Sequence, residues 1–158
     1  MFKRLVFFAL FFSLLPALVL AASFSGKLVK VIDGDTVEVL RQGKAQRIRL
    51  AEIDCPERGQ AYGAKAKQFV LDLAAGQIVS IEERDVDRYG RTIGEVFLPD
   101  GRSLNRELVR SGLAHWYRRY SNDASLGVLE AEARAQKRGL WVDENVMAPW
   151  EYRAAKRN

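Results

Sequence analysis

The sequence predicts a mainly β protein with helices, built on a small closed antiparallel barrel of five strands of the OB type with about three helices. Three observations lead to this prediction. Five short segments are rich in β-branched residues and roughly alternate in polarity, turn sequences separate them, and a helical pattern interrupts the series after the third segment. Too few strand pairs are joined by a helix to build a parallel α/β sheet.

The first three strands are expected to form a meander. They are predicted at residues 28–32, 36–40 and 46–50, and Gln42-Gly43-Lys44 supplies a hairpin turn between the second and the third. A meander of this kind places the ends of neighbouring strands close together in space.

A helix over residues 64–73 is predicted next, because apolar residues recur there at near-helical spacing and Gly76 follows as a C-terminal cap. Strands at 78–82 and 92–97 complete the barrel, with the turn 87–91 between them. Two further helices are predicted near residues 103–108 and 126–133, the last ending before Gly139.

Residues 1–22 have the pattern of a secretory signal. Lys3 and Arg4 precede an almost wholly apolar stretch, and small residues up to Ala22 suit a signal peptidase. We therefore expect export to a secreted or periplasmic location. The alternative is an uncleaved membrane anchor, since the apolar stretch approaches the ~18 residues at which a spanning helix becomes possible.

Residues 23–150 are long enough for one domain and too short for two, and the polar tail 151–158 is expected to fray. We expect a monomer. The formal net charge of +5 is compatible with an anionic ligand. Because Cys55 is the single cysteine, an exported chain would depend on its core and not on an internal disulfide.

Charged residues gather where the predicted strands end. Asp33-Gly34-Asp35 precedes the second strand, Arg49 ends the third, and Asp54-Cys55-Pro56-Glu57 follows it. The turn Asp87-Arg88-Tyr89-Gly90-Arg91 adds a second arginine. Such residues offer little to an apolar core and much to a metal ion that holds a phosphate. The pattern therefore indicates a phosphodiesterase site.

The chain resembles the staphylococcal nuclease family over nearly all of the region after the signal. The resemblance is carried by residues 32–37, Arg49 with 54–57, 87–91, Leu104-Asn105 with Leu108-Val109, Gly112-Leu113-Ala114 and Gly139-Leu140-Trp141. It implies an OB-type barrel and a calcium-dependent nuclease that acts on DNA and RNA.

Residue by residue, the resemblance makes Asp35 and Asp54 direct calcium ligands beside the backbone carbonyl of Cys55, with Asp33 at a nearby acidic position. The family more often has threonine at the position of Cys55, which matters little if only the carbonyl binds the metal. Glu57 corresponds to the acid that contacts the attacking water.

The resemblance makes Arg49 and Arg91 the two phosphate-binding arginines. Physical chemistry supports these roles, because a guanidinium presents a planar fork of donors to phosphate oxygens and stays charged. Fixed cations stabilise the charge that grows during attack on a phosphodiester. A hard divalent ion would neutralise the aspartates, and calcium suits oxygen ligands better than zinc does.

Tyr89, Tyr117 and Tyr120 are candidates for stacking on bases, a contact that tolerates any sequence; core packing is the alternative for Tyr117. Each motif also has a plain structural reading as a turn or the end of a strand. A second function is open as well, a catalytically inactive OB-fold module that binds nucleic acid. Because the five side chains of the implied catalytic set are present, namely Asp35, Arg49, Asp54, Glu57 and Arg91, the sequence favours the enzyme.

Overall fold

The computed structural model describes residues 22–157, so the predicted signal lies outside the described residues except for Ala22. Five strands close into a barrel in the order β1-β2-β3-β6-β5, as predicted. Their bounds are β1 Ser23–Val31, β2 Thr36–Arg41, β3 Lys44–Leu50, β5 Ile78–Val86 and β6 Thr92–Phe97. Two further strands of two residues, β4 Ile53–Asp54 and β7 His115–Trp116, pair beside the barrel.

The sequence predicts an antiparallel barrel, but one junction of the barrel is parallel. β3 and β6 run parallel, with Arg49 opposite Ile93, whereas the other four junctions are antiparallel. The reason is geometric: five strands are an odd number, so strict alternation of direction cannot close around the ring. The parallel junction joins the strand that carries Arg49 to the strand that begins just after Arg91.

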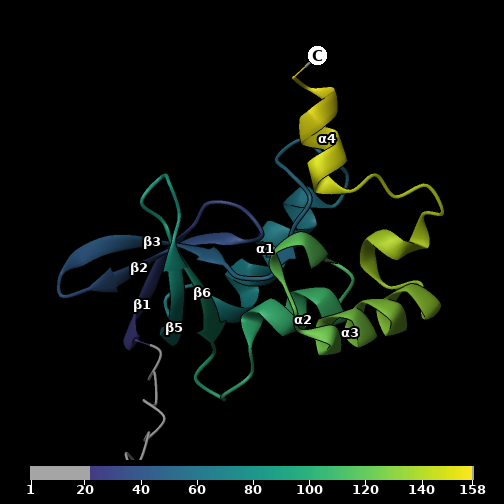
Figure 1. The fold of residues 1–158 in the computed structure, drawn as a ribbon. Coiled ribbons are helices and arrows are strands. Elements are labelled where there is room, and N and C mark those ends of the chain that lie inside the picture. The colour runs from purple at the N-terminus through teal and green to yellow at the C-terminus, as the bar shows by residue number, and fades with distance from the viewer. Residues whose placement is uncertain (1–21, 158) are drawn as a thin grey trace, which may run out of the picture.

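Four α-helices accompany the barrel, where about three were predicted. Their bounds are α1 Gly63–Ala74, α2 Leu104–Arg110, α3 Ala124–Ala135 and α4 Pro149–Ala155. Short 3-10 helices lie at Arg118–Tyr120 and Gly139–Val142. In Figure 1, α2 and α3 lie side by side next to the barrel, and α4 stands apart at the C-terminal end of the chain.

The main core fills the barrel and continues into the space beneath the helices. Its fully buried side chains come from all five barrel strands, from β4 and from α1 and α2, and include Leu28, Val37, Val39, Ile48, Leu50, Ile53, Val70, Ile81, Val96, Leu104 and Leu108. A small second cluster of Ala133, Leu140 and Trp141 lies between α3 and the C-terminal segment. The rigid barrel therefore fixes the strand ends at which the acidic residues lie.

The expectation that residues 151–158 fray is wrong for residues 151–155, which belong to α4. Pro149 begins this helix with a backbone angle already suited to it, and the Glu151 carboxylate accepts a hydrogen bond from the Ala148 N–H at 3.0 Å. The Trp150 ring packs on Tyr117 and His115, and these contacts anchor the first turn of α4 and so the polar residues that follow in the helix. Within residues 22–157, no helix combines the length and the apolar character that crossing a membrane requires.

Candidate active site

The site forms where the start of β2, the end of β3 and the strand β4 meet. β2 and β3 pair so that Thr36 lies opposite Arg49, and the Leu50 N–H donates to the Asp35 carbonyl at 2.8 Å. After β3 the chain turns sharply at Glu52, whose φ is 64°. This turn brings Asp54 back beside Arg49, which also contacts Asp35. Side chains from three short segments of the chain thus form one cluster.

Arg49 is the centre of the cluster. Its Nη2 atom lies 2.9 Å from Asp54 Oδ1 and 3.2 Å from Asp35 Oδ2. Its Nη1 atom donates to the carbonyls of Leu50 and Ile53, at 2.7 and 3.0 Å, and so braces the turn. Burial opposes the charged form of Arg49, but the charges of Asp35 and then Asp54 hold its pKa above the ordinary value. The guanidinium is therefore a fixed cation on the barrel wall.

Asp35 is held in place by its neighbours. Its Oδ2 atom accepts a hydrogen bond from the Cys55 N–H at 2.7 Å, and its Oδ1 atom accepts one from the Thr36 hydroxyl at 3.2 Å. Gly34 permits this arrangement, because a Cβ atom there would lie 2.7 Å from Ala66 Cβ and 2.9 Å from Cys55 Sγ. Close packing under Gly34 thus fixes both the acid and the backbone of Cys55.

The Cys55 side chain is buried, and burial raises the pKa of its thiol well above the ordinary value. The thiol is therefore neutral and poorly placed for nucleophilic chemistry. What Cys55 offers to this site is its backbone.

Two acids of the site, Asp33 and Asp54, hold protons more strongly than isolated carboxylates do. Burial raises the pKa of Asp54, a hydrogen bond from Arg153 opposes that rise, and the charge of Asp35 adds to it. Burial and then the charge of Asp35 raise the pKa of Asp33 to about 6. Burial is thus the main cause of both shifts, and the neighbouring charge of Asp35 adds to it.

Arg153, in α4, is a residue of this site that sequence reasoning missed. Its Nη2 atom lies 2.8 Å from Asp54 Oδ2, and its Nη1 atom lies 3.2 Å from Asp54 Oδ1 and 2.5 Å from Glu57 Oε1. These bonds, above all those to Asp54, raise the pKa of Arg153. The expected fraying of the tail hid this residue, although Pro149 and Trp150 carried the signal of a docked helix.

Glu57 lies on the loop between β4 and α1 and reaches solvent more than Asp54 does. Its side chain is 35% exposed, against 1% for Asp54. The Gln60 amide secures the loop: it accepts from the Glu57 N–H at 2.9 Å and donates to the Met147 carbonyl at 2.8 Å. A carboxylate in this position can meet water while it stays tied to the buried acids through Arg153.

Arg91 lies apart from these acids, on the turn between β5 and β6. Its Nε atom lies 2.7 Å from Asp87 Oδ2, while Asp87 Oδ1 accepts the backbone N–H groups of Tyr89 and Arg91. Among residues 22–157, no ion pair joins Arg91 to Asp35, Asp54 or Glu57. Its place in the catalytic set stays a prediction.

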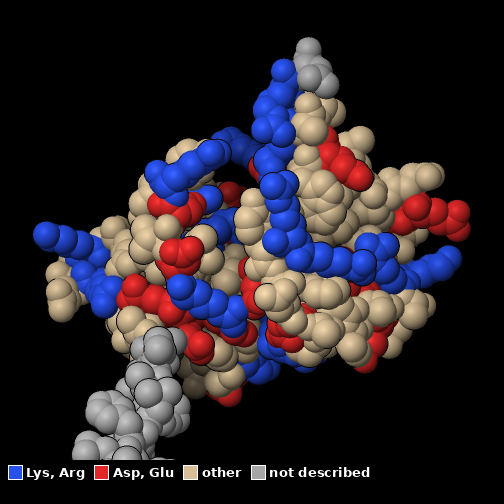
Figure 2. Space-filling view, viewed as in Figure 1, with Lys and Arg blue, Asp and Glu red and all other residues tan. Residues whose placement is uncertain are grey.

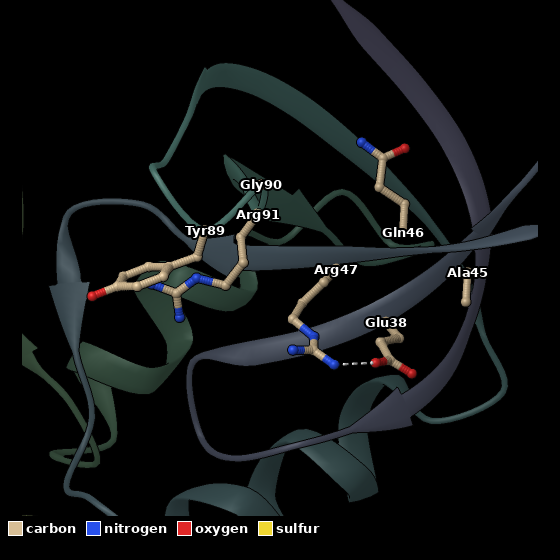
Figure 3. A pocket seen from close by; sticks show the side chains of 7 residues that line it. All are labelled: Glu38, Ala45, Gln46, Arg47, Tyr89, Gly90 and Arg91. Atoms are coloured by element: carbon tan, nitrogen blue, oxygen red, sulfur yellow. Dashed lines mark hydrogen bonds and ion pairs between the residues drawn. The ribbon is translucent and has the colours of Figure 1, made fainter.

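Arg91 lines an open cavity of about 620 Å³ together with Glu38, Ala45, Gln46, Arg47, Tyr89 and Gly90 (Figure 3). Arg47, on β3, has a side chain that is 53% exposed, and its Nη2 atom lies 3.0 Å from Glu38 Oε1 on the wall of this cavity. The cavity therefore presents two guanidinium groups, from Arg47 and Arg91, to whatever enters it.

The three candidate tyrosines differ in their surroundings. Tyr117 stacks on Trp150 with ring centroids 5.2 Å apart and planes at 7°, and contacts Tyr120 edge to face. This geometry matches the packing alternative for Tyr117. Tyr89 and Tyr120 are mostly exposed, so their rings are accessible to a ligand. Their role as stacking residues stays a prediction.

His115 is the single histidine of the chain, and it does not lie on the surface. It is buried between Trp141 and Trp150, and burial, followed by the charge of Arg134, lowers its pKa to about 4. A neutral imidazole in such a position serves packing.

The donor chemistry of the cluster suits a hard cation. The carboxylates of Asp35 and Asp54 converge on one nitrogen of Arg49, so their oxygens face a common point. Within the described part of the chain, no group of three or more acids, histidines or cysteines is placed as a ready metal cluster. A metal here would thus draw on two carboxylates together with backbone or water oxygens, ligands typical of calcium and magnesium.

Comparisons with known proteins agree with this geometry. A family model described as "Staphylococcal nuclease homologue" matches residues 47–143. A protein of Escherichia coli O157:H7 named "Uncharacterized endonuclease" is 46% identical over 138 residues, which are 87% of this chain and 90% of that protein. A protein of Shigella flexneri named "Micrococcal nuclease" is 44% identical over 147 residues, 87% of this chain and 84% of that one.

The barrel, the site and these relatives together define a phosphodiester hydrolase that acts on nucleic acid. The chain belongs to the staphylococcal nuclease family. The matched residues include Arg49, Asp54, Glu57 and Arg91, while Asp35 lies before the matched region.

Proposed function

We propose that this nuclease is an exported, calcium-dependent enzyme that hydrolyses phosphodiester bonds of DNA and RNA with little sequence preference. The observation that carries the proposal is the cluster in which Arg49 binds both Asp35 and Asp54 while Glu57 lies at its solvent side. It combines an anion-binding cation, a cation-binding pair of acids and an accessible proton acceptor.

Asp35 and Asp54, with the backbone carbonyl of Cys55, would hold the calcium ion, and Asp33 would add negative charge nearby. Bound there, the ion would neutralise the two carboxylates and draw electrons from an oxygen of the phosphate. Such a partner would favour the charged forms of Asp33 and Asp54, whose pKa values are raised by burial and then by the charge of Asp35.

Arg49 would bind oxygens of the scissile phosphate and stabilise the charge that develops on them. Its bonds to the carbonyls of Leu50 and Ile53 fix the guanidinium before substrate arrives, so little reorganisation is required. Arg91 would bind the phosphate from the neighbouring turn, where Asp87 orients it. Glu57 would hold the attacking water and accept its proton, because its carboxylate is the one that reaches solvent.

Low sequence preference is supported by the kinds of group that surround the site. Arginine forks recognise phosphate and carry no information on the base. The exposed rings of Tyr89 and Tyr120 offer stacking faces that suit any base, in single-stranded DNA and RNA alike.

Cleavage assays on purified protein test the proposal. We expect degradation of plasmid DNA and of RNA in calcium, loss of both activities in a chelator and recovery when calcium is restored. Calorimetric titration with calcium should detect binding in wild type and not in Asp35→Asn/Asp54→Asn. Cleavage at the full rate in chelator would refute the assignment of the metal, and cleavage of only one nucleic acid would narrow the substrate.

A further inference from the structure

A second hollow lies beside the active site, between α4 and the loop that carries Glu57. It has a volume of about 300 Å³ and is lined by Glu57, Arg58, Tyr152, Arg153, Lys156 and Arg157. Cationic side chains dominate this lining. We call this hollow the α4 groove. Because Glu57 forms part of its wall, the groove borders the carboxylate that we propose as the holder of the attacking water.

Most of the positive charge of the α4 groove is not compensated. Arg153 is bound to Asp54 and Glu57, but Arg58, Lys156 and Arg157 form no ion pair with any carboxylate of residues 22–157. All three side chains are exposed. Figure 2 shows Lys and Arg atoms along the C-terminal helix and onward over the adjoining face of the molecule. An anion in the groove would therefore meet free cations and little competing negative charge.

The groove is a built feature, because α4 is held from two sides. Trp150 stacks on Tyr117, and the Gln60 amide bonds the Met147 carbonyl just before the helix. The Tyr152 hydroxyl lies against Gly59, on the loop that forms the opposite wall. These contacts fix α4 and its Arg153 relative to Glu57, and Lys156 and Arg157 follow directly at the end of the helix.

We propose that the α4 groove is a second phosphate-binding site, which takes the sugar–phosphate backbone of the substrate next to the bond being cut. The inference rests on the proposed function and deepens it. A polynucleotide is a continuous string of anions, so a strand with one phosphate at Arg49 places neighbouring phosphates on the surfaces around the site. The α4 groove, whose wall includes Glu57, is such a surface. Exposed Lys and Arg side chains bind such phosphates without reading sequence.

Binding measurements in chelator test the groove apart from the chemistry. The variant is Lys156→Ala/Arg157→Ala, and the matched control is Lys27→Ala/Lys67→Ala, which removes two cations from β1 and α1 outside the groove. The probe is a labelled single strand of about 12 nucleotides, followed by fluorescence anisotropy at several salt concentrations. We expect affinity to fall about tenfold in the variant, and the slope of log K against log salt to lessen by about 1.4, which is ~0.7 for each of the two cations removed. The control should bind within about twofold of wild type.

Cleavage in calcium gives a second measurement. The variant should cleave a dinucleotide, which is too short to reach the groove, at the wild-type rate, and should show a raised KM on the longer strand. Unchanged oligonucleotide binding and salt slope would overturn the proposal, as would an equal loss on both substrates. Loss of binding to anionic phospholipid vesicles alone would also overturn it and assign the surface to a membrane. A wild-type protein that cleaves nothing yet shows the expected binding differences would refute the proposed function and leave the groove standing.

Discussion

Arg153 binds Asp54 through both terminal nitrogens, although 99 positions separate the two residues in the sequence. Asp54 is almost completely buried, and the same guanidinium also bonds Glu57. A cation from the last helix thus lies on a carboxylate that we propose as a metal ligand. Arg153 and a metal ion would compete for the Asp54 carboxylate. The position of α4, which carries Arg153, would therefore affect how tightly the metal binds.

Arg153→Ala should therefore bind calcium about tenfold more tightly, a change of ~1.4 kcal/mol, because a competing cation is removed. Without metal the same variant should unfold at a lower temperature, since Asp54 loses a partner for its buried charge. Calorimetric titration and thermal unfolding measure the two effects. Arg102→Ala is the control, because Arg102 is exposed and contacts neither acid among the described ion pairs. An unchanged calcium affinity in Arg153→Ala would contradict the proposal that Arg153 competes with calcium for Asp54.

The choice of metal follows from the ligands. Two carboxylates and backbone oxygen form a loose site, which calcium accepts and which magnesium, with its stricter octahedral demand, fills poorly. We expect activity with calcium, at most weak activity with magnesium and none in chelator, measured on one DNA substrate at equal ionic strength. Equal rates with the two metals would contradict the account of a flexible site.

The two proposed phosphate-binding arginines should each matter to the rate. Arg49→Ala and Arg91→Ala should lower cleavage by at least ~100-fold, the usual effect of removing one well-placed charge-stabilising donor. Their stabilities should differ: Arg49→Ala should also lower the melting temperature, because Arg49 braces two carbonyls and two acids, whereas Arg91 pairs only with Asp87 among the described residues.

Arg102→Ala is the suitable control for this pair, because Arg102 is an exposed residue bound to Asp100 and Glu107. Arg47 is not a neutral choice, since it shares a cavity with Arg91. Wild-type rates in both Arg49→Ala and Arg91→Ala would remove the two arginines from the mechanism.

The single thiol should be dispensable. Cys55→Ser should keep most of the activity, since the site uses the backbone of Cys55 and a thiol is a poor calcium ligand. In the folded wild type the buried thiol, with its raised pKa, should react slowly with an alkylating reagent and quickly after denaturation. A folded Cys55→Ser variant that binds calcium but cannot cleave would reveal a chemical role for the sulfur.

If the protein is exported, its mass should show that the signal has been removed. The protein recovered outside the cytoplasm should lack residues 1 to about 22, because the order of cationic, apolar and small residues is the pattern that a signal peptidase cleaves. Intact mass spectrometry of the exported fraction gives the answer. Full-length chain in a membrane fraction would support the anchor instead.

The strands and the acidic positions could be predicted because their signals are local. β-branched alternation marks the barrel strands, and Asp33-Gly34-Asp35 with Asp54 to Glu57 stand out at strand ends. The parallel junction between β3 and β6 depends on closing the whole ring, which no local pattern encodes. The salt bridge of Arg153 depends on docking between segments 99 positions apart, and the burial of His115 depends on two tryptophans that follow it in the chain.

The stack of Trp150 on Tyr117 supplies a natural optical probe of the site. Trp116 packs against the main core and Trp141 lies in the second cluster, so both should give a steady background. Emission that changes while metal or nucleic acid is added would then follow the position of α4 in real time. The enzyme carries its own fluorophore, Trp150, a few residues from Arg153. Stopped-flow fluorescence could therefore compare the rate at which α4 moves with the rate of bond cleavage, without any attached dye.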